Sequence, residues 1–346
     1  MLLRRLFLTS IAALCTALPT FAAKPKAAAA PYKGAIVMDA ASGDVVFEEN
    51  ADIVTPPASV TKLMTFLVVH DRIQSGHLSA GTEVTVNAQD ARMGGTQVWL
   101  KEGEVFTVEE LLYALMIQSA NDAAHALARA AAGSKEAFVE LMNARAQVLG
   151  MSKTTFRSPH GLPPPSRKLS EGDLTSPRDL ALLSRELLRT TDVLRYSSVK
   201  ERPFRPEALE PVIMRNHNHL LGKVGGVDGL KTGFTNGAGF CLAATAERNG
   251  RRVIVVVMGS PDRVTRDLRV GELIERGFAA LPPLPAGTQT LGASNPISPV
   301  TPSSREKPIR PAGNPISTPV SPAAPTPTPA PAPTVTFPGV TRPKQR

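Results

Sequence analysis

The first candidate for chemistry in this sequence is a serine placed three residues before a lysine, in Ser59-Val60-Thr61-Lys62. Two prolines precede the motif closely and favour a helix start, and residues three apart share one helical face, so the Ser59 hydroxyl and the Lys62 amine can touch. A lysine can activate a serine once burial and a neighbouring cation lower its pKa. The tetrapeptide alone is not specific, because the same spacing recurs at Ser197 and Lys200 and at Ser304 and Lys307.

Two further clusters could complete such a site. Ser119-Ala120-Asn121 follows an apolar helical run, so a hydroxyl and an amide fall at a turn between helices, although this pattern is also common in ordinary caps and turns. Lys231-Thr232-Gly233 comes shortly before a predicted strand that begins at Gly239. A cation, a hydroxyl and a glycine on an edge strand form an anion-binding rim that a substrate backbone can approach. This last cluster is the least expected by chance.

The elements that would position these clusters predict an α+β domain. Residues 33–40 and 45–48 form one expected β-hairpin, and residues 239–247 and 251–258 form another around Asn249-Gly250. Helical periodicity covers residues 59–74, 108–132, 134–149, 176–188 and 264–278. Strands at both ends with helices between them predict one antiparallel sheet made from the two ends of the domain, flanked by helices, with a cleft beside a helical lobe.

The 346 residues divide into three segments by composition. Residues 1–23 are typical of a secretory signal peptide, with two arginines, an apolar run and Thr20-Phe21-Ala22 as a cleavage site. Residues 282–346 carry 18 of the 32 prolines and a net charge of +5, which predicts a disordered, proline-rich basic tail. The whole chain is +9 and the signal +2, so residues 24–281 are left at +2. A nearly neutral domain argues against a nucleic acid as partner.

Cysteine usage and the first residues bear on the compartment. Cys15 lies in the signal, so the mature chain keeps only Cys241, which we expect to be buried as a small hydrophobic residue. Leu14 argues against a lipid anchor at Cys15, because the residue directly before a lipidated cysteine is normally small. Arg4-Arg5 leaves a twin-arginine export route open beside the general one. We expect an exported protein of the periplasm or cell envelope.

Taken together, the three clusters and their order resemble the penicillin-binding protein and serine β-lactamase superfamily, and most closely its low-molecular-mass D-alanyl-D-alanine carboxypeptidases, serine peptidase family S11. The resemblance extends over about residues 33–278 and includes Pro159-His160-Gly161-Leu162 and Gly226-Val227-Asp228-Gly229-Leu230. It implies a β-lactamase/transpeptidase-like fold. It also implies an enzyme that removes the terminal D-alanine from peptidoglycan stem pentapeptides through an acyl-enzyme, with β-lactams as inhibitors.

The resemblance gives four positions a catalytic role. Ser59 would be the nucleophile, and Lys62 would accept its proton. Ser119 would relay that proton to the leaving amine. Asn121 would hold both Lys62 and the substrate backbone. The backbone N–H groups of Ser59 and Phe234 would form the oxyanion hole, in which one donor contributes ~3 kcal/mol.

Substrate binding falls on the K-T-G strand. The resemblance implies that Lys231 keeps the site positive, which lowers the pKa of Lys62, and that Thr232 binds the terminal carboxylate beside Gly233. Arg266 is a second candidate for that carboxylate. Its neighbours Arg263 and Arg269 make ordinary surface charge an equal alternative for this arginine.

Several other residues have a structural and a functional interpretation. Trp99 could stack on substrate, but packing in the core or lobe is favoured. Glu171 and Asp173 lie in a loop where class A β-lactamases carry a water-activating glutamate, yet the surrounding Glu-x-x-Leu-Asn pattern is absent. Slow hydrolysis of β-lactams is therefore expected. The six histidines show no H-x-x-x-H or H-E-x-x-H spacing, which argues against a metal site, and nothing implies a cofactor.

Three functions remain at this point. The first is a carboxypeptidase, the second an endopeptidase on peptide crosslinks or a β-lactamase, and the third a non-catalytic wall-binding protein. A wall-binding protein without activity needs no complete proton path. The non-catalytic alternative is therefore disfavoured by the presence of all five polar residues, Ser59, Lys62, Ser119, Asn121 and Lys231. The tail shows no apolar helical face, so membrane association beyond the signal is doubtful, and an inert solubilising tail is favoured over a spacer through the wall.

Overall fold

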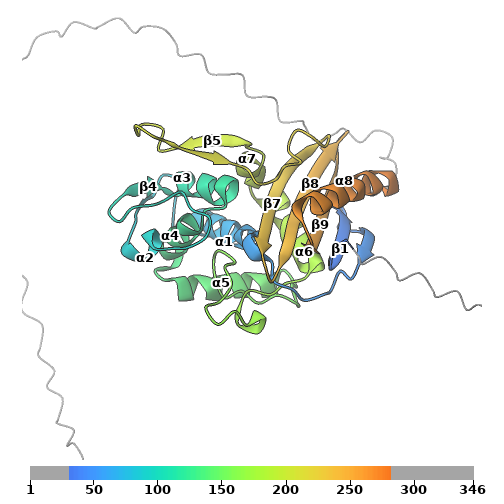
Figure 1. Ribbon diagram of the computed structural model, residues 1–346, viewed down its shortest axis with the longest axis horizontal. Coiled ribbons are helices and arrows are strands. Elements are labelled where there is room, and N and C mark those ends of the chain that lie inside the picture. Colours follow the sequence, from blue (N-terminus) through green and yellow to red (C-terminus); the bar gives the residue numbers. More distant parts are fainter. Residues whose placement is uncertain (1–30, 282–346) are drawn as a thin grey trace, which may run out of the picture. The chain divides into compact units, whose positions relative to one another are not determined.

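The computed structural model describes residues 31–281, and the predicted signal peptide, Cys15 and the proline-rich tail lie outside the described residues. The prediction of an α+β domain is confirmed. A five-stranded sheet with the strand order β2-β1-β9-β8-β7 combines strands from both ends of the domain, and every neighbouring pair is antiparallel (Figure 1).

Both predicted hairpins are confirmed as parts of this sheet. The first joins β1 (Gly34–Asp39) to β2 (Val45–Glu49), and the second joins β8 (Gly239–Arg248) to β9 (Arg251–Ser260). Asn249 and Gly250 form the second turn with φ values of +51° and +72°, the left-handed pair that a two-residue hairpin needs. The remaining strand, β7 (Val227–Thr235), lies at the sheet edge and carries the K-T-G cluster.

The sheet is buried on both faces, which explains its nearly continuous apolar strands. In β9, Val253, Val255 and Val257 belong to the core beneath α8 (Arg263–Ala280), which covers one face of the sheet (Figure 1). The alternating residues Ile254, Val256 and Met258 belong to the core shared with the helical lobe. Successive side chains of a strand point to opposite faces, so one strand serves both cores.

The helical lobe lies on the other side of the sheet (Figure 1). Its helices are α1 (Lys62–Gln74), α2 (Ala88–Ala91), α3 (Val108–Tyr113), α4 (Asn121–Ala132), α5 (Lys135–Val148), α6 (Pro177–Thr190) and α7 (Val193–Ser197), with single turns at Ala58–Thr61, Ala114–Gln118 and Leu169–Glu171. Sequence patterns did not predict the two small hairpins, β3 (Glu83–Thr85) with β4 (Val105–Thr107) and β5 (Glu201–Phe204) with β6 (Val212–Arg215). Their strands are only three or four residues long and give little periodicity.

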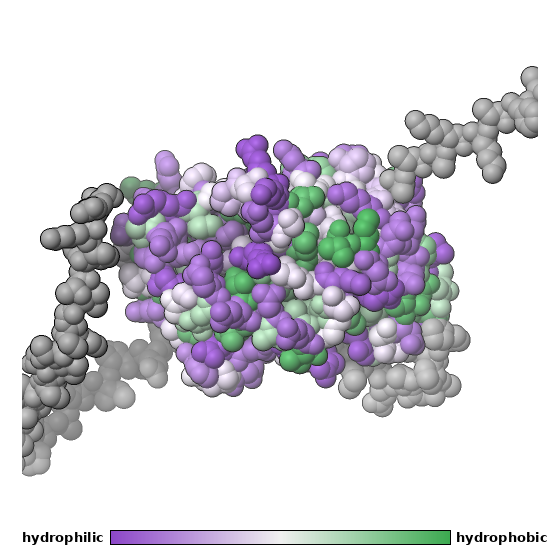
Figure 2. All heavy atoms as spheres, turned by 90° about the horizontal axis from the view of Figure 1, so that it is seen from below, coloured by the Kyte–Doolittle hydropathy of each residue, from purple (hydrophilic) through white to green (hydrophobic). Residues whose placement is uncertain are grey.

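The surface of the described domain is mostly hydrophilic on the face in Figure 2, with small separate apolar patches. Among residues 31–281, no helix combines the length and apolar character needed to cross a membrane.

Candidate active site

The predicted nucleophile stands at the junction between sheet and lobe. Ser59 lies in a single 3₁₀ turn, Ala58–Thr61, and the α-helix begins only at Lys62. The residue before the serine, Ala58, has a φ of +50°, a left-handed conformation that costs a residue with a side chain of order 1–3 kcal/mol. Such strain persists only where surrounding contacts enforce it, and here the neighbouring segments described below supply those contacts.

Lys62 is completely buried and lies among three polar partners. Its Nζ is 3.0 Å from Ser59 Oγ, 2.7 Å from Asn121 Oδ1 and 2.9 Å from the carbonyl oxygen of His160. The amide and backbone oxygens can only accept hydrogen bonds. A neutral amine donates its two N–H groups to them and keeps its lone pair for the proton of the Ser59 hydroxyl. The geometry therefore suits lysine as a base.

The charge state of Lys62 points the same way. Burial, assisted by the Lys231 ammonium, lowers the pKa of the Lys62 amine well below its usual value, while the carboxylates of Asp173 and Asp122 act less strongly in the opposite direction. A buried cation without a carboxylate partner is costly, so the proton is released more readily than from a lysine in water.

The Ser119-Ala120-Asn121 cluster occupies the predicted turn between two helices. A π-helical turn, Ala114–Gln118, follows α3 and ends at Ser119, which has a left-handed φ of +63°. π-Turns within helices are common at functional sites. α4 then begins at Asn121, whose backbone N–H donates to the Thr96 carbonyl and whose side-chain amide donates to the Gly94 carbonyl, both at 2.8 Å. These bonds aim the Asn121 oxygen at Lys62.

The K-T-G strand approaches the serine from the sheet side. A Cβ on Gly233 would lie 2.6 Å from the Pro57 carbonyl oxygen and 2.9 Å from the Ser59 nitrogen, so only glycine allows this approach. Lys231 is buried, its Nζ donates to the Thr232 carbonyl at 3.0 Å, and burial together with Arg266 lowers its pKa to about 7. The three sequence clusters are thus brought together around Ser59.

Two further predicted residues lie near this strand. Arg266 is buried in the first turn of α8, where it pairs with Asp267 at 2.6 Å, so the alternative of ordinary surface charge is wrong. Phe234 stacks its ring on Phe240, with centroids 4.1 Å apart, and its side chain is half exposed. His217 was not assigned to the site from sequence, yet burial and then Lys231 lower its pKa to about 4.

The segment from Ser158 to Asp173 supplies contacts that motif spacing missed. Burial and then the neighbouring Lys62 lower the pKa of the His160 imidazole to about 3, so the ring is neutral while its carbonyl accepts from Lys62. The buried Asp173 carboxylate accepts from the Thr61 hydroxyl at 3.0 Å and the Ser158 hydroxyl at 2.9 Å. Both ends of the loop are therefore tied to the turn that holds the nucleophile. Backbone carbonyls leave no sequence signal, so the sequence pointed to this segment only through the similarity at Pro159-His160-Gly161-Leu162 and the comparison of its loop with that of class A β-lactamases.

Gly161 provides a direct test of this packing. It has a φ of +81°, and a Cβ there would lie 1.9 Å from the Ala58 carbonyl oxygen. We expect Gly161→Ala to lower the free energy of unfolding by at least about 3 kcal/mol and to reduce activity, since Ala58 must move. The matched control is Gly103→Ala, with a similar φ of +87° but open space around it, which should cost only about 1 to 2 kcal/mol. Urea unfolding of both variants measures the difference, and equal losses would contradict this account.

Trp99, Glu171 and Cys241 were also singled out from the sequence. The favoured packing of Trp99 is wrong: its side chain is 63% exposed, its φ is +59°, and its backbone oxygen accepts from Arg205. Glu171 is exposed, where it accepts from Ser166 and pairs with Lys168. Cys241 is buried, as predicted. Among the residues that the structure describes, no cluster of three or more histidine, cysteine or acidic side chains could hold a metal ion.

Comparison with known proteins agrees with this geometry. A family model described as D-alanyl-D-alanine carboxypeptidase matches residues 20–262. D-alanyl-D-alanine carboxypeptidase DacC of Escherichia coli is 38% identical over 250 residues, or 70% of this chain and 60% of the relative. DacF of Bacillus subtilis is 34% identical over 247 residues, or 71% of this chain and 62% of the relative.

The matched region therefore spans about three fifths of the length of these two relatives. Among solved structures, penicillin-binding protein D2 of Listeria monocytogenes in its ampicillin-bound form is similar, with a TM-score of 0.65 and 33% identity, covering 74% of this chain and 100% of that one. With the fold, the converging clusters and the family match in agreement, the chain belongs to the D-alanyl-D-alanine carboxypeptidase family of serine peptidases, S11.

Proposed function

We propose that this protein is a serine-type D-alanyl-D-alanine carboxypeptidase that removes the terminal D-alanine from peptidoglycan stem pentapeptides and is acylated by β-lactams. The observation that carries the proposal is the contact between Lys62 Nζ and Ser59 Oγ, 3.0 Å long, at a fully buried amine whose pKa is lowered. A hydroxyl beside an uncharged amine is an activated nucleophile. The carboxypeptidase names of the relatives and the ampicillin complex of the Listeria protein support the choice of substrate and inhibitor.

Acylation begins at Ser59. Its oxygen attacks the carbonyl carbon between the two D-alanines while its proton passes to Lys62. The tetrahedral oxyanion accepts hydrogen bonds from the backbone N–H groups of Ser59 and Phe234. The close packing of Gly233 on the turn that carries Ser59 supports this oxyanion hole, because it brings the edge of β7 next to the nucleophile. Donors fixed in advance in this way stabilise the charge that develops in the transition state.

Collapse of the intermediate breaks the amide bond. The proton travels from Lys62 through Ser119 to the leaving nitrogen, so the terminal D-alanine departs as a neutral-amine product and Ser59 keeps the acyl group as an ester. Water then hydrolyses the ester. Asn121 holds Lys62 through its side-chain oxygen, at 2.7 Å. With Glu171 paired in the loop, the same hydrolysis of a bound β-lactam is slow, which favours a long-lived adduct over β-lactamase activity.

A carboxypeptidase substrate ends in a free carboxylate, and the site has a positively charged region to bind it. Lys231 and Thr232 lie on the edge strand beside Ser59, and the buried Arg266 adds a second positive charge close to Lys231. A carboxylate entering this region meets cations that have been removed from water, where charge pairing is strongest. We further propose that the signal exports the protein to the cell envelope, where stem peptides are found.

Product analysis separates the remaining functions. We expect purified mature protein to release D-alanine from pentapeptide muropeptides, seen as the loss of one residue by mass spectrometry, with crosslinked dimers cleaved more slowly. Faster cleavage of dimers would make the protein an endopeptidase. Binding of muropeptides without any product would support a non-catalytic wall protein and contradict the proposal.

The pH dependence of acylation tests the charge coupling at the site. In Lys231→Ala the neighbouring cation is gone, so the pKa of Lys62 rises, and the neutral form that acts as base appears only at higher pH. We expect the acid limb of the penicillin acylation rate to move to higher pH, with a lower rate throughout. Lys101→Ala, a change of an exposed lysine, should leave the profile unchanged. An unchanged acid limb in Lys231→Ala would contradict the coupling.

A further inference from the structure

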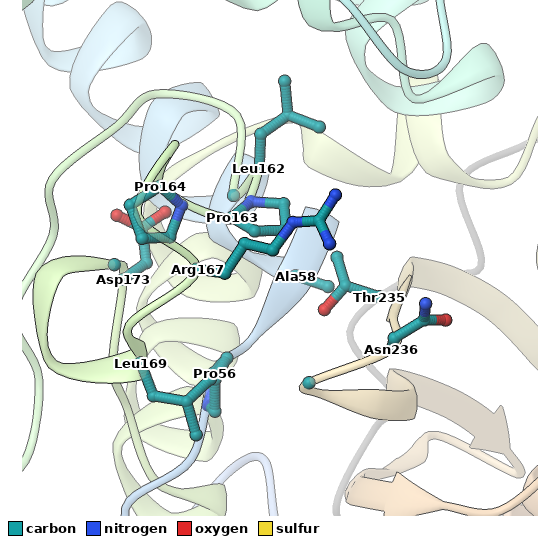
Figure 3. Close-up of a pocket in the computed structure, with 13 residues that line it drawn as sticks. Pro56, Ala58, Leu162, Pro163, Pro164, Arg167, Leu169, Asp173, Thr235 and Asn236 are labelled. Carbon is teal, nitrogen blue, oxygen red and sulfur yellow. The ribbon is translucent and has the colours of Figure 1, made fainter.

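A cavity of about 390 Å³ lies directly beside the turn that carries the nucleophile. Ala58, the residue before Ser59, forms part of its wall. The loop that begins at Gly161 closes one side, and the end of β7 with the turn Thr235–Gly237 closes the other (Figure 3). The cavity therefore borders the turn that carries Ser59, but its lining contains none of the residues to which a catalytic role has been given.

The direction of the substrate follows from the proposed function, on which this inference rests. The terminal carboxylate lies at Thr232 and the reacting carbonyl at the N–H of Phe234, so the substrate runs along the edge of β7. A strand rises about 3.3 Å per residue. The part of the substrate on the acyl side of the scissile bond therefore continues toward Thr235 and the following turn, where the cavity opens.

The cavity wall has more apolar than polar surface. Pro56, Leu162, Pro163 and Leu169 are among its apolar side chains, and the polar side chains are Arg167, Asp173, Thr235 and Asn236. The one carboxylate in the wall, Asp173, is occupied by the hydroxyls of Thr61 and Ser158 and by the backbone N–H groups of Arg157 and Ser158. It is therefore saturated with donors and is a poor partner for a ligand cation.

The available charge in this cavity is positive. Arg167 lies at its rim, and Figure 3 shows the guanidinium reaching across the opening toward Thr235. Within residues 31–281 this guanidinium forms no ion pair or hydrogen bond with a carboxylate. A second cation, the Lys33 ammonium, donates to the Gly237 carbonyl at 3.2 Å and so lies at the same turn. An arginine with a free planar fork favours a carboxylate.

The backbone of the loop fixes the position of Arg167. Its N–H donates to the Pro164 carbonyl at 2.9 Å, and its φ of +57° is left-handed. The loop also touches the opposite wall, since a Cβ on Gly237 would lie 3.0 Å from Leu169 Cδ2. The cavity is therefore bounded on both sides, with an apolar floor and a cation at its mouth.

We propose that this cavity binds the side chain of the residue that precedes the two D-alanines, and that Arg167 selects a side chain with an aliphatic stem and a terminal carboxylate. The stem packs on the prolines and leucines, and the carboxylate reaches the guanidinium at the rim. Arg167 is thus a specificity residue for the acyl donor. A peptide with a neutral amide or an ammonium at the same place has the apolar contact but not the charge pairing.

Synthetic peptides of the form acetyl-X-D-alanyl-D-alanine test this selection. X is L-2-aminoadipate, its side-chain amide, L-lysine or L-norleucine. We expect the wild-type protein to prefer aminoadipate over its amide about fivefold in kcat/KM, the scale of a partly exposed ion pair, with the difference in KM. Arg167→Ala should remove this preference while leaving turnover of the norleucine peptide nearly unchanged. Arg167→Glu should favour the lysine peptide instead.

The matched control is the adjacent cation in the same loop. Lys168 is exposed, pairs with Glu171 at 3.4 Å and does not line the cavity, so Lys168→Ala should keep the wild-type preference. Turnover of all four peptides with the same preference in wild type and Arg167→Ala would overturn the role of Arg167 and leave the proposed function intact. Absence of D-alanine release from any peptide would overturn the proposed function, and this inference with it.

Discussion

Alanine in place of Ser59 is expected to reduce D-alanine release from a pentapeptide by at least about 10⁴-fold, because no other group is placed to form the acyl bond. The change removes one oxygen from a partly exposed side chain, so the fold should persist. Release of D-alanine, followed by mass spectrometry or a coupled assay, measures the loss, and thermal unfolding checks that the variant is folded.

The second serine with a lysine three residues later provides the control. Ser197 is buried, and its hydroxyl donates to the Asp228 carbonyl of β7 at 3.3 Å. Ser197→Ala should retain activity within about threefold of wild type. If this variant were the inactive one and Ser59→Ala remained active, the nucleophile would be wrongly assigned.

Lys62 variants should show the next largest effect. Lys62→Met removes the proton acceptor and should reduce acylation by about 10³-fold or more, within the range of a lost acid–base group that acts as a unit with its nucleophile. Lys62→Arg separates two roles, because arginine keeps a positive charge but cannot release its proton at ordinary pH. We expect both variants to be inactive, as measured by the rate of penicillin acylation.

Substantial activity in Lys62→Arg would mean that Lys62 acts as a fixed cation rather than a base. Asn121→Gln is a useful companion variant, since it keeps the amide but displaces the oxygen that lies 2.7 Å from Lys62 Nζ. A smaller loss in Asn121→Gln than in Lys62→Met is expected, because the base is then misplaced rather than absent.

Local patterns predicted both hairpins of the sheet and the contact between Ser59 and Lys62. Asn249-Gly250 and the apolar strands around it define their hairpin without help from the rest of the chain, and the three-residue spacing of Ser59 and Lys62 survives as a 3.0 Å contact. The convergence of Asn121 and Lys231 on Lys62 was predicted from the family resemblance. Spacing along the chain says little about groups that meet only in three dimensions.

The rest of the site depends on backbone atoms and on close approach. A sequence motif does not report backbone features of this kind, because every residue carries a carbonyl and a glycine does not by itself indicate a close approach. Three such features are the His160 carbonyl that accepts from Lys62, the left-handed Ala58 and the absence of a Cβ at Gly161. The prediction that Trp99 packs in the core or lobe was wrong for a different reason. Its size favours burial in general, but here a left-handed backbone turns it out toward solvent.

The central claim is that Ser59, activated by a neutral Lys62, forms the covalent intermediate. The most direct measurement is to label the intact protein with penicillin, digest it and map the adduct by tandem mass spectrometry. The account predicts a single adduct on Ser59, formed faster as the pH rises through the pKa of Lys62. An adduct on Ser119 or Ser197, or no adduct on a protein that still releases D-alanine, would contradict it.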